Sequence, residues 1–314
     1  MTHQSRVQGG LWGSIVGDAL GVPAEFKSRG TLKNSPVRSL IGHGTHNQPA
    51  GTWSDDSSLL LCTADSLVLN EFDTDDIGRR FCAWYYENLW TPHGSVFDVG
   101  RTTSMAISSI SRGTRAEAAG GVDESSNGNG SLMRMIPVAL RFASSPVDRL
   151  LDNTHRVSAI THGHRRSQIA CGIFSLFVRE LLSGASAAEA LDSTRCVFES
   201  YYEDDVRWRS ETEIFHPLFA KDFRQREMDA ISSSGYVLHT LEASLWCLLT
   251  TDNYRDCVLK AVNLGGDTDT TGCVAGGLAG VLYGVEAIPA DWIAEMARKD
   301  DIEQLFNTFT QLIP

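Results

Sequence analysis

Apolar residues recur at helical spacing along almost the whole chain, and no stretch alternates apolar and polar residues as a half-buried strand does. A chain without strands has no crossover βαβ units, so the pattern predicts an all-α fold. We expect one domain over residues 1–314, because no linker-like segment or repeat divides the chain. The segments with helical spacing are 7–20, 57–69, 75–90, 101–111, 131–143, 147–160, 165–183, 186–201, 236–250, 254–263, 269–284, 290–298 and 301–312.

The predicted loops are long and rich in Gly, Asn, Ser, Thr and Asp, notably 27–53, 112–130 and 264–268. Loops of this length inside a compact domain are often functional. The segment 202–231 is instead charged and aromatic, and we interpret it as a solvated surface insertion in the same domain.

Three glycines recur every four residues in the predicted helix 269–284, at Gly272, Gly276 and Gly280. Glycine inside a helix costs about 1 kcal/mol relative to alanine. Their spacing places them on one helix face, which predicts that a second backbone packs very close to it. A membrane GxxxG pair is disfavoured, because acidic residues precede the helix and its apolar length is short.

The chain is acidic, with 39 Asp and Glu residues against 27 Lys and Arg residues and a net charge of -12. A broad nucleic-acid interface needs a basic face, so we expect no nucleic-acid partner. A small anionic ligand is still compatible with this charge. No stretch is long and apolar enough to cross a membrane, and we expect no membrane association.

The compartment follows from the cysteines and the first residues. The seven cysteines form no CxxC pair, which predicts buried free thiols rather than a disulfide frame or a zinc site. Asp18 interrupts the apolar run from Gly9 to Ala24, and only Arg6 precedes it as a basic residue, which argues against a signal peptide. We therefore expect a cytoplasmic protein.

Two short acidic clusters, far apart in the chain, each precede an apolar helical run. The first is Ser54, Asp55 and Asp56; the second is Asp267, Asp269 and Thr270. Helix capping explains the first cluster well when it is taken alone, and it competes about evenly with metal binding for the second. If brought together, the carboxylates and hydroxyls of both clusters would make an oxygen-only site for two ions of Mg²⁺ or Mn²⁺, whereas zinc prefers His or Cys.

A calcium-binding EF-hand loop is the other interpretation of the second cluster. Counted from Asp267, the sixth position is Gly272, as that motif requires. The twelfth position requires a bidentate Glu but holds Leu278. The EF-hand interpretation is therefore rejected.

Five motifs in a fixed order give the chain a family resemblance. The chain resembles the ADP-ribosylglycohydrolases, which include dinitrogenase-reductase-activating glycohydrolases and ADP-ribosyl-acceptor hydrolases, from about Gly10 to Tyr283. Each motif is weak alone, but the ordered set is specific. The motifs are Gly17-Asp-Ala-Leu-Gly-Val-Pro-Ala-Glu-Phe26, Trp53-Ser-Asp-Asp-Ser57, Phe97-Asp-Val-Gly100, Asn127-Gly-Asn-Gly-Ser-Leu-Met-Arg134 and Gly265-Gly-Asp-Thr-Asp-Thr270.

The resemblance implies an all-α fold and a dinuclear Mg²⁺ (or Mn²⁺) site. It implies hydrolysis of the bond between C1'' of ADP-ribose and an acceptor side chain, most simply arginine in a modified protein, with ADP-ribose as product. Hydrolysis of serine-linked, guanidine or O-acetyl conjugates, a noncatalytic ADP-ribose-binding regulator and a metal-dependent phosphohydrolase are the alternatives. The implied metal ligands are Ser54, Asp55, Asp56, Asp267, Asp269 and Thr270; Ser54 stands where the family usually has Thr, but keeps the hydroxyl.

Three carboxylates are candidates for moving the proton in this reaction: Glu25, Asp55 and Asp98. By resemblance, Glu25 is a mobile glutamate near the metals, although such an acid after a helix is ordinarily only solvent-facing. Asp98 is a candidate base or ribose contact, and capping of the helix that starts near Gly100 explains it about equally well.

The substrate contacts are expected around the motif that starts at Asn127. Glycines let backbone N–H groups approach an anion, and a following helix Leu132–Phe142 would favour phosphate. The resemblance makes this motif the pyrophosphate site, with Ser131 as the best donor; an ordinary turn is the alternative. The expected contacts are Asn127, Gly128, Asn129, Gly130, Ser131, His162, His164 and Tyr236, of which Tyr236 would stack near adenine and the histidines have capping or core roles as alternatives. The acceptor-binding loops, expected within 27–50 and 90–97, carry no readable code, and the oligomeric state is not indicated.

Overall fold

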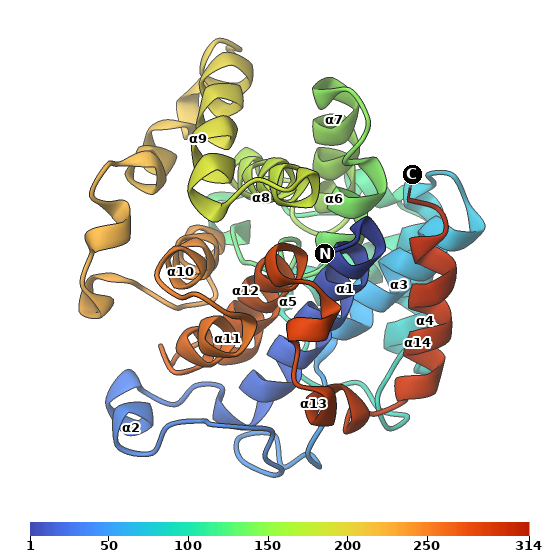
Figure 1. Cartoon of the computed structure of the whole chain (residues 1–314). Helices are drawn as coiled ribbons and strands as arrows, with labels where there is room; N and C mark the ends of the chain where they lie inside the picture. Colours follow the sequence, from blue (N-terminus) through green and yellow to red (C-terminus); the bar gives the residue numbers. More distant parts are fainter. Residues whose placement is uncertain (314) are drawn as a thin grey trace.

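The computed structural model describes residues 1–313, and it is built from helices (Figure 1). No sheet forms within these residues, where only three isolated β-bridges occur. The all-α prediction is therefore confirmed. The α-helices are α1 (His3–Gly21), α2 (Arg29–Asn34), α3 (Asp55–Leu69), α4 (Thr74–Glu87), α5 (Arg101–Ser111), α6 (Ile136–Phe142), α7 (Val147–Ala159), α8 (Arg165–Ser183), α9 (Ala187–Phe198), α10 (Val237–Leu249), α11 (Tyr254–Val262), α12 (Thr268–Tyr283), α13 (Ala290–Ala294) and α14 (Lys299–Thr310).

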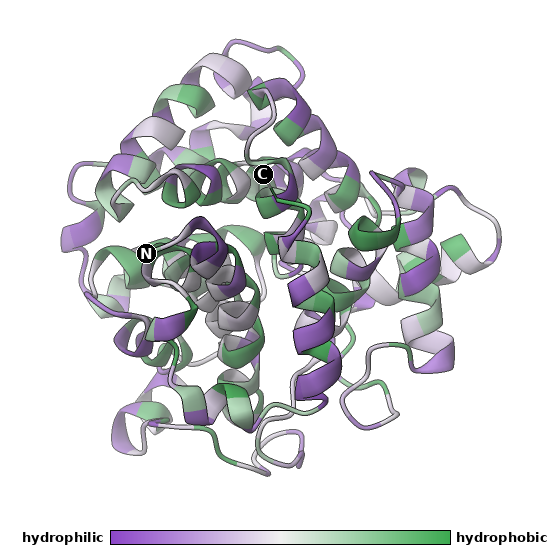
Figure 2. Cartoon of the chain, turned by 45° about the vertical axis from the view of Figure 1, so that its right-hand side comes forward, coloured by the Kyte–Doolittle hydropathy of each residue, from purple (hydrophilic) through white to green (hydrophobic). Residues whose placement is uncertain are grey.

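Helices α1 and α12 form the centre of the molecule, with α10 and α11 on one side and α3, α4 and α14 on the other (Figure 1). Almost every residue of α1 and α12 is buried. The outer helices carry hydrophilic residues on the faces turned to solvent (Figure 2). The two helices that carry the recurring glycines thus lie in the core, and the second acidic cluster at the start of α12 lies there with them.

Glycines bring α1 and α12 into backbone contact. A Cβ on Gly13 would lie 2.3 Å from the carbonyl oxygen of Gly276, and one on Gly17 would lie 2.0 Å from that of Gly272. Gly9 faces Gly280 in the same way. The close neighbour predicted from the glycines of α12 is therefore α1, whose own glycines have the same spacing of four.

Several helices begin directly after a polar residue that caps their first turn. Ser54 accepts a hydrogen bond from the N–H of Asp56, and Asp73 accepts from the N–H groups of Asp75 and Asp76. Ser186 forms a complete capping box with Glu189 at the start of α9. Each of these side chains satisfies backbone donors that the first turn leaves free.

Three expectations about the elements need correction. The segment 131–143 becomes helical only at Ile136, since residues 131–134 form turns and Pro137 lies in the first helical turn, where its missing N–H is tolerated. The segment 290–298 is helical only over 290–294. Helix α2 was not expected at all, because its six residues are too few for a periodic pattern.

The segment 202–231 begins at the end of a π-helix (Glu199–Glu203) and continues in short 3-10 helices, with no regular α-helix. Its charged side chains face solvent, but Trp208, Phe215 and Phe223 are buried in the main core. The hydroxyl of buried Tyr202 meets His155 Nε2 at 2.7 Å. The segment is thus anchored to α7 and α8 by aromatic side chains.

Over residues 1–313, none of the helices has both the length and the apolar character needed to cross a bilayer.

Candidate metal and substrate site

The two acidic clusters meet where α3 and α12 begin, beside the end of α1. Asp55 and Asp56 lie in the first turn of α3, and Asp269 lies in the first turn of α12. Glu25 follows α1, and Asp98 precedes α5. Asp55, Asp56, Asp98, Asp267, Thr270 and Glu25 line one pocket of about 390 Å³. Two clusters that each resembled a helix cap therefore form one site.

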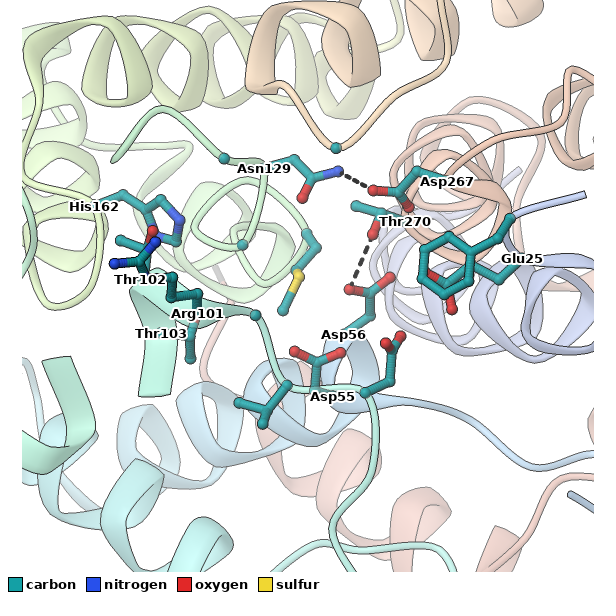
Figure 3. Close-up of a pocket in the computed structure, with 18 residues that line it drawn as sticks. Glu25, Asp55, Asp56, Arg101, Thr102, Thr103, Asn129, His162, Asp267 and Thr270 are labelled. Atoms are coloured by element: carbon teal, nitrogen blue, oxygen red, sulfur yellow. Dashed lines mark hydrogen bonds between the residues drawn. The ribbon is translucent and has the colours of Figure 1, made fainter. Parts of the chain in front are cut away.

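Two hydrogen bonds tie the clusters to each other and to the Asn127 motif (Figure 3). Thr270 Oγ1 donates to Asp56 Oδ1 at 3.3 Å, and Asn129 Nδ2 donates to Asp267 Oδ2 at 2.9 Å. The other oxygens, Asp56 Oδ2 and Asp267 Oδ1, are buried and have no hydrogen-bond partner among the described residues. Buried carboxylate oxygens without donors are costly unless a cation binds them, so this donor set fits divalent metal ions.

Burial and mutual repulsion raise the pKa values of these acids. Burial is the main cause of the raised pKa of Asp55, Asp56 and Asp269, and neighbouring carboxylates add to it. The pKa of Glu25 rises to about 10, first through burial and then through Asp98 and Asp267. A bound cation would reverse this balance by stabilising the ionised forms.

Asp18 braces the start of α3 from within α1. Its carboxylate accepts hydrogen bonds from the N–H groups of Ser54 and Ser57 at about 3.0 Å and from Ser57 Oγ at 2.5 Å. It is fully buried, and burial raises its pKa to about 6. Asp18, Asp56 and Asp269 also offer oxygens close enough to hold one ion. The sequence pattern gave Asp18 no role in the site.

Ser54 and Asp269 lie behind the pocket surface. Ser54 is 1% exposed and its hydroxyl caps α3, while Asp269 is also 1% exposed and stands beside Asp56 and Asp18. Capping does not use all the lone pairs of a hydroxyl, so Ser54 can both cap the helix and face an ion.

Glu25, His46 and Asp98 form a second group at the pocket rim. His46 Nε2 is hydrogen-bonded to Glu25 Oε2 and lies 4.0 Å from Asp98 Oδ2. Asp98 has a left-handed backbone with φ 53°, which is uncommon outside glycine. Gly100, not Asp98, is the N-cap of α5, so the capping interpretation of Asp98 is wrong. His46 lies in a loop without periodicity, and the sequence offered no signal for it.

The opposite end of the pocket has donors instead of acids. His162 and Arg101 line it on the side away from Glu25 (Figure 3), with Gly128 and Gly130 next to the His162 ring, while the side chain of Asn129 turns to Asp267. The backbone N–H groups of Gly128 and Gly130 have no protein acceptor within residues 1–313. Arg101 is exposed and is the one Lys or Arg residue among those lining the pocket. This end of the pocket therefore suits an anion. The sequence did not predict Arg101 as a site residue, because an arginine at the start of a helix is common.

Arg134 supports the glycine loop (Gly128–Gly130) from the protein interior. It is fully buried, and its guanidinium donates to the carbonyl of Gly130 at 2.5 Å and to Thr161 Oγ1 at 2.7 Å. Thr161 Oγ1 in turn lies 2.7 Å from His162 Nδ1. Burial and the nearby Arg134 charge lower the pKa of His162 to about 3, so its ring is neutral at the pocket wall.

Several expected substrate contacts do not line the pocket. Ser131 Oγ accepts a hydrogen bond from Ser158 and lies 3.4 Å from Cys171 Sγ, whereas the Ser131 N–H has no protein acceptor among the described residues. His164 caps α8, which is the alternative role considered for it. The Asn127 side-chain oxygen accepts a hydrogen bond from Ser167, and its carbonyl accepts one from the N–H of Val237. Tyr236 lies next to the pocket residue Gly235.

Comparison with known proteins decides the family. The sequence profile described as ADP-ribosylglycohydrolase matches residues 1–314. The chain belongs to this family. ADP-ribosylglycohydrolases are enzymes, and the expected family and enzyme class are both confirmed.

The sequence matches to related proteins cover most of this chain. It is 32% identical to ADP-ribosylarginine hydrolase Tri1 of Pseudomonas putida (strain GB-1), over 96% of this chain and 76% of the relative. It is 29% identical to the ADP-ribosyl-[dinitrogen reductase] glycohydrolase of Rhodospirillum rubrum, over 95% of this chain and 92% of the relative. A solved structure titled ADP-ribosylglycohydrolase-related protein complex matches with a TM-score of 0.83 and 32% identity, covering 99% of each chain.

Proposed function

We propose that this enzyme hydrolyses the N-glycosidic bond between ADP-ribose and an arginine side chain of a modified protein, releasing ADP-ribose and the restored arginine. The relatives named as an ADP-ribosylarginine hydrolase and as a glycohydrolase of ADP-ribosyl-dinitrogen reductase support this choice. The observation that carries it is the pocket itself, which has unpartnered buried carboxylate oxygens at one end and free N–H donors with Arg101 at the other.

We propose two Mg²⁺ ions, or Mn²⁺, as the resident metals. Their ligands would be the oxygens of the two acidic clusters: Ser54, Asp55, Asp56, Asp267, Asp269 and Thr270. Such ions supply a Lewis acid that orients ribose hydroxyls and lowers the pKa of bound water. The unpartnered oxygens of Asp56 and Asp267 support this assignment.

The chain's own residues would bind and orient the rest of the substrate. The N–H groups of Gly128, Gly130 and Ser131, with Arg101, would hold the pyrophosphate, because backbone donors and a guanidinium favour phosphate oxygens. Asn129 would fix Asp267 through the 2.9 Å hydrogen bond. Tyr236 and His162 are the proposed contacts for the adenosine part, next to Gly235 and Gly128.

In the reaction, the oxygen of a water forms a bond to C1'' while the bond from C1'' to the guanidine nitrogen breaks. The water loses one proton, and the departing guanidine nitrogen gains one. Glu25, Asp55 and Asp98 all line the pocket and are the candidates to carry that proton. His46, hydrogen-bonded to Glu25, would hold this carboxyl at the pocket rim.

The test is release of free ADP-ribose from an arginine-modified protein, with Mg²⁺ and with a chelator. We expect Mg²⁺-dependent release, and we expect Asp269→Asn to abolish it without unfolding the protein. A panel with serine-linked ADP-ribose and O-acetyl-ADP-ribose would identify the acceptor. ADP-ribose binding without turnover of any conjugate would instead favour a noncatalytic sensor, and release of phosphate would favour a phosphohydrolase.

A further inference from the structure

Phe26 is exposed and has an unusual backbone at the pocket rim. The residue is 68% exposed although it lines the pocket, and its φ is 62°. An aromatic residue rarely adopts this left-handed region, and strain of this kind is found at functional sites. The backbone is held there because the Phe26 N–H donates to the carbonyl of Gly266 at 2.7 Å. Phe26 thus keeps a large apolar ring in water, and its backbone in the left-handed region, although both are unfavourable.

Phe26 is the first of three rings in a row. Its ring centroid is 6.2 Å from that of His46, which is 5.3 Å from that of Phe97. Hydrogen bonding to Glu25 fixes the His46 ring between the two phenylalanines. We call Phe26, His46 and Phe97 the aromatic rim.

The aromatic rim lies at the acidic end of the pocket. Glu25 and Asp98 belong to this end and are not among the proposed metal ligands. Arg101, the one Lys or Arg residue among those lining the pocket, belongs to the other end, on the side opposite Glu25 (Figure 3). A cation at the rim would therefore meet two further carboxylates and an aromatic face, and both attract a planar guanidinium.

The shape of ADP-ribose directs its leaving group to this rim. In the distal ribose, C1'' and C4'' flank the ring oxygen, so the leaving group and the pyrophosphate extend to opposite ends of the sugar. With the pyrophosphate at Arg101 and the glycine loop, and the ribose at the acidic clusters, the leaving group points to Glu25 and Phe26. This placement of the leaving group rests on the proposed function.

We propose that Phe26, supported by His46 and Phe97, is the platform on which the guanidinium of the acceptor arginine stacks. The platform selects arginine-linked over hydroxyl-linked ADP-ribose, because a neutral serine leaving group gains nothing from cation–π attraction or from the extra carboxylates.

The experiment measures kcat/KM for one protein bearing arginine-linked ADP-ribose and one bearing serine-linked ADP-ribose. In Phe26→Leu we expect the ratio of the arginine value to the serine value to fall about 2- to 30-fold, the range of a lost cation–π contact. Phe26→Trp should keep or raise this ratio. Phe26→Gly should lower it while the melting temperature does not fall, because glycine relieves the strained φ.

Tyr86→Leu is the matched control, because Tyr86 is also an exposed aromatic residue (54%) but does not line this pocket. We expect no change in its ratio. An unchanged ratio in both Phe26→Leu and Phe26→Gly overturns the platform.

Failure of the proposed function has a different signature. If the wild-type enzyme releases no ADP-ribose from the arginine-linked substrate, the proposed acceptor is wrong whatever the variants do. The platform is then tested by binding of agmatine, a free guanidine, in the presence of ADP-ribose. Weaker agmatine binding to Phe26→Leu than to the wild type supports the platform, and equal binding overturns it.

Discussion

Gly21→Ala tests whether the contact between α1 and α12 sets the metal site. The added Cβ would lie 2.3 Å from both the backbone N and Cα of Asp269, whereas ordinary contacts begin at 3.4 Å. The two backbones must therefore separate by about 1 Å near a proposed metal ligand. Mg²⁺ requires near-ideal octahedral geometry at about 2.0–2.1 Å, so a displacement of this size disrupts coordination.

Two opposing effects decide the change in stability. Overpacking costs about 1–3 kcal/mol, and replacing glycine by alanine recovers up to about 1 kcal/mol of helix propensity. We expect a net loss of about 1–2 kcal/mol from these two ranges. Unfolding entropy of about 2.1 cal/mol/K per residue converts this loss to a fall in Tm of roughly 2–3 °C for a chain of 314 residues.

Gly9→Ala is the matched control, because its Cβ would lie 2.1 Å from the carbonyl oxygen of Gly280 at the far end of the same helix pair. Gly9 and Gly21 are roughly 18 Å apart along α1 at 1.5 Å per residue. We expect similar Tm losses in both variants, measured by differential scanning fluorimetry with EDTA. Added Mg²⁺ should raise Tm in Gly9→Ala but hardly in Gly21→Ala. A full Mg²⁺ response in Gly21→Ala would refute the reasoning.

Three further predictions concern the cap, the anion end and the acids. Ser54→Ala and Ser186→Ala each remove a helix cap and should each lower the free energy of unfolding by about 1 kcal/mol. Only Ser54→Ala should weaken Mg²⁺ binding measured by calorimetry. Equal Mg²⁺ affinities in the two variants would show that Ser54 is not a metal ligand. Arg101→Met should weaken ADP-ribose binding more than adenosine binding, whereas Arg101→Lys should largely restore it, and a uniform loss for both ligands would contradict a phosphate contact. The pKa values of Asp18 (about 6) and Glu25 (about 10) are raised, so their neutral forms stabilise the metal-free fold. This stability is complete below the unfolded pKa values near 4 and is lost as the pH rises through the folded values. The Tm difference between protein with Mg²⁺ and protein with EDTA should therefore widen from pH 5 to pH 8, and a constant difference would contradict the link between these carboxyl groups and metal binding.

The sequence predicted the elements better than their partners. The glycines of α12 indicated a close neighbour, and the equal spacing of Gly9, Gly13 and Gly17 would have identified α1, but the apolar residues between them concealed it. The true start of α6 was signalled by Pro137, whereas the apolar residues at 132 and 133 favoured an earlier start.

The candidate site divides in the same way. Short clusters at helix starts were recognisable because carboxylates and hydroxyls there exceed what a cap needs. His46 and Arg101 were not, because one lies in an irregular loop and the other looks like a solvated helix residue. Asp18 was not recognisable either, since its partners, Ser54 and Ser57, become visible only in three dimensions.

The pairing of α1 with α12 also has a consequence for biosynthesis. The ribosome makes α1 before α12, and α2 to α11 lie between them in the sequence, so the glycine face of α1 stays uncovered until α12 has been made. Its five glycines make it a weak helix alone, and contacts between such distant segments form slowly. Asp55 and Asp56 are likewise made long before Asp267 and Asp269. An unfinished chain therefore cannot assemble the full acidic site, and we expect catalytic competence to appear only when folding is nearly complete.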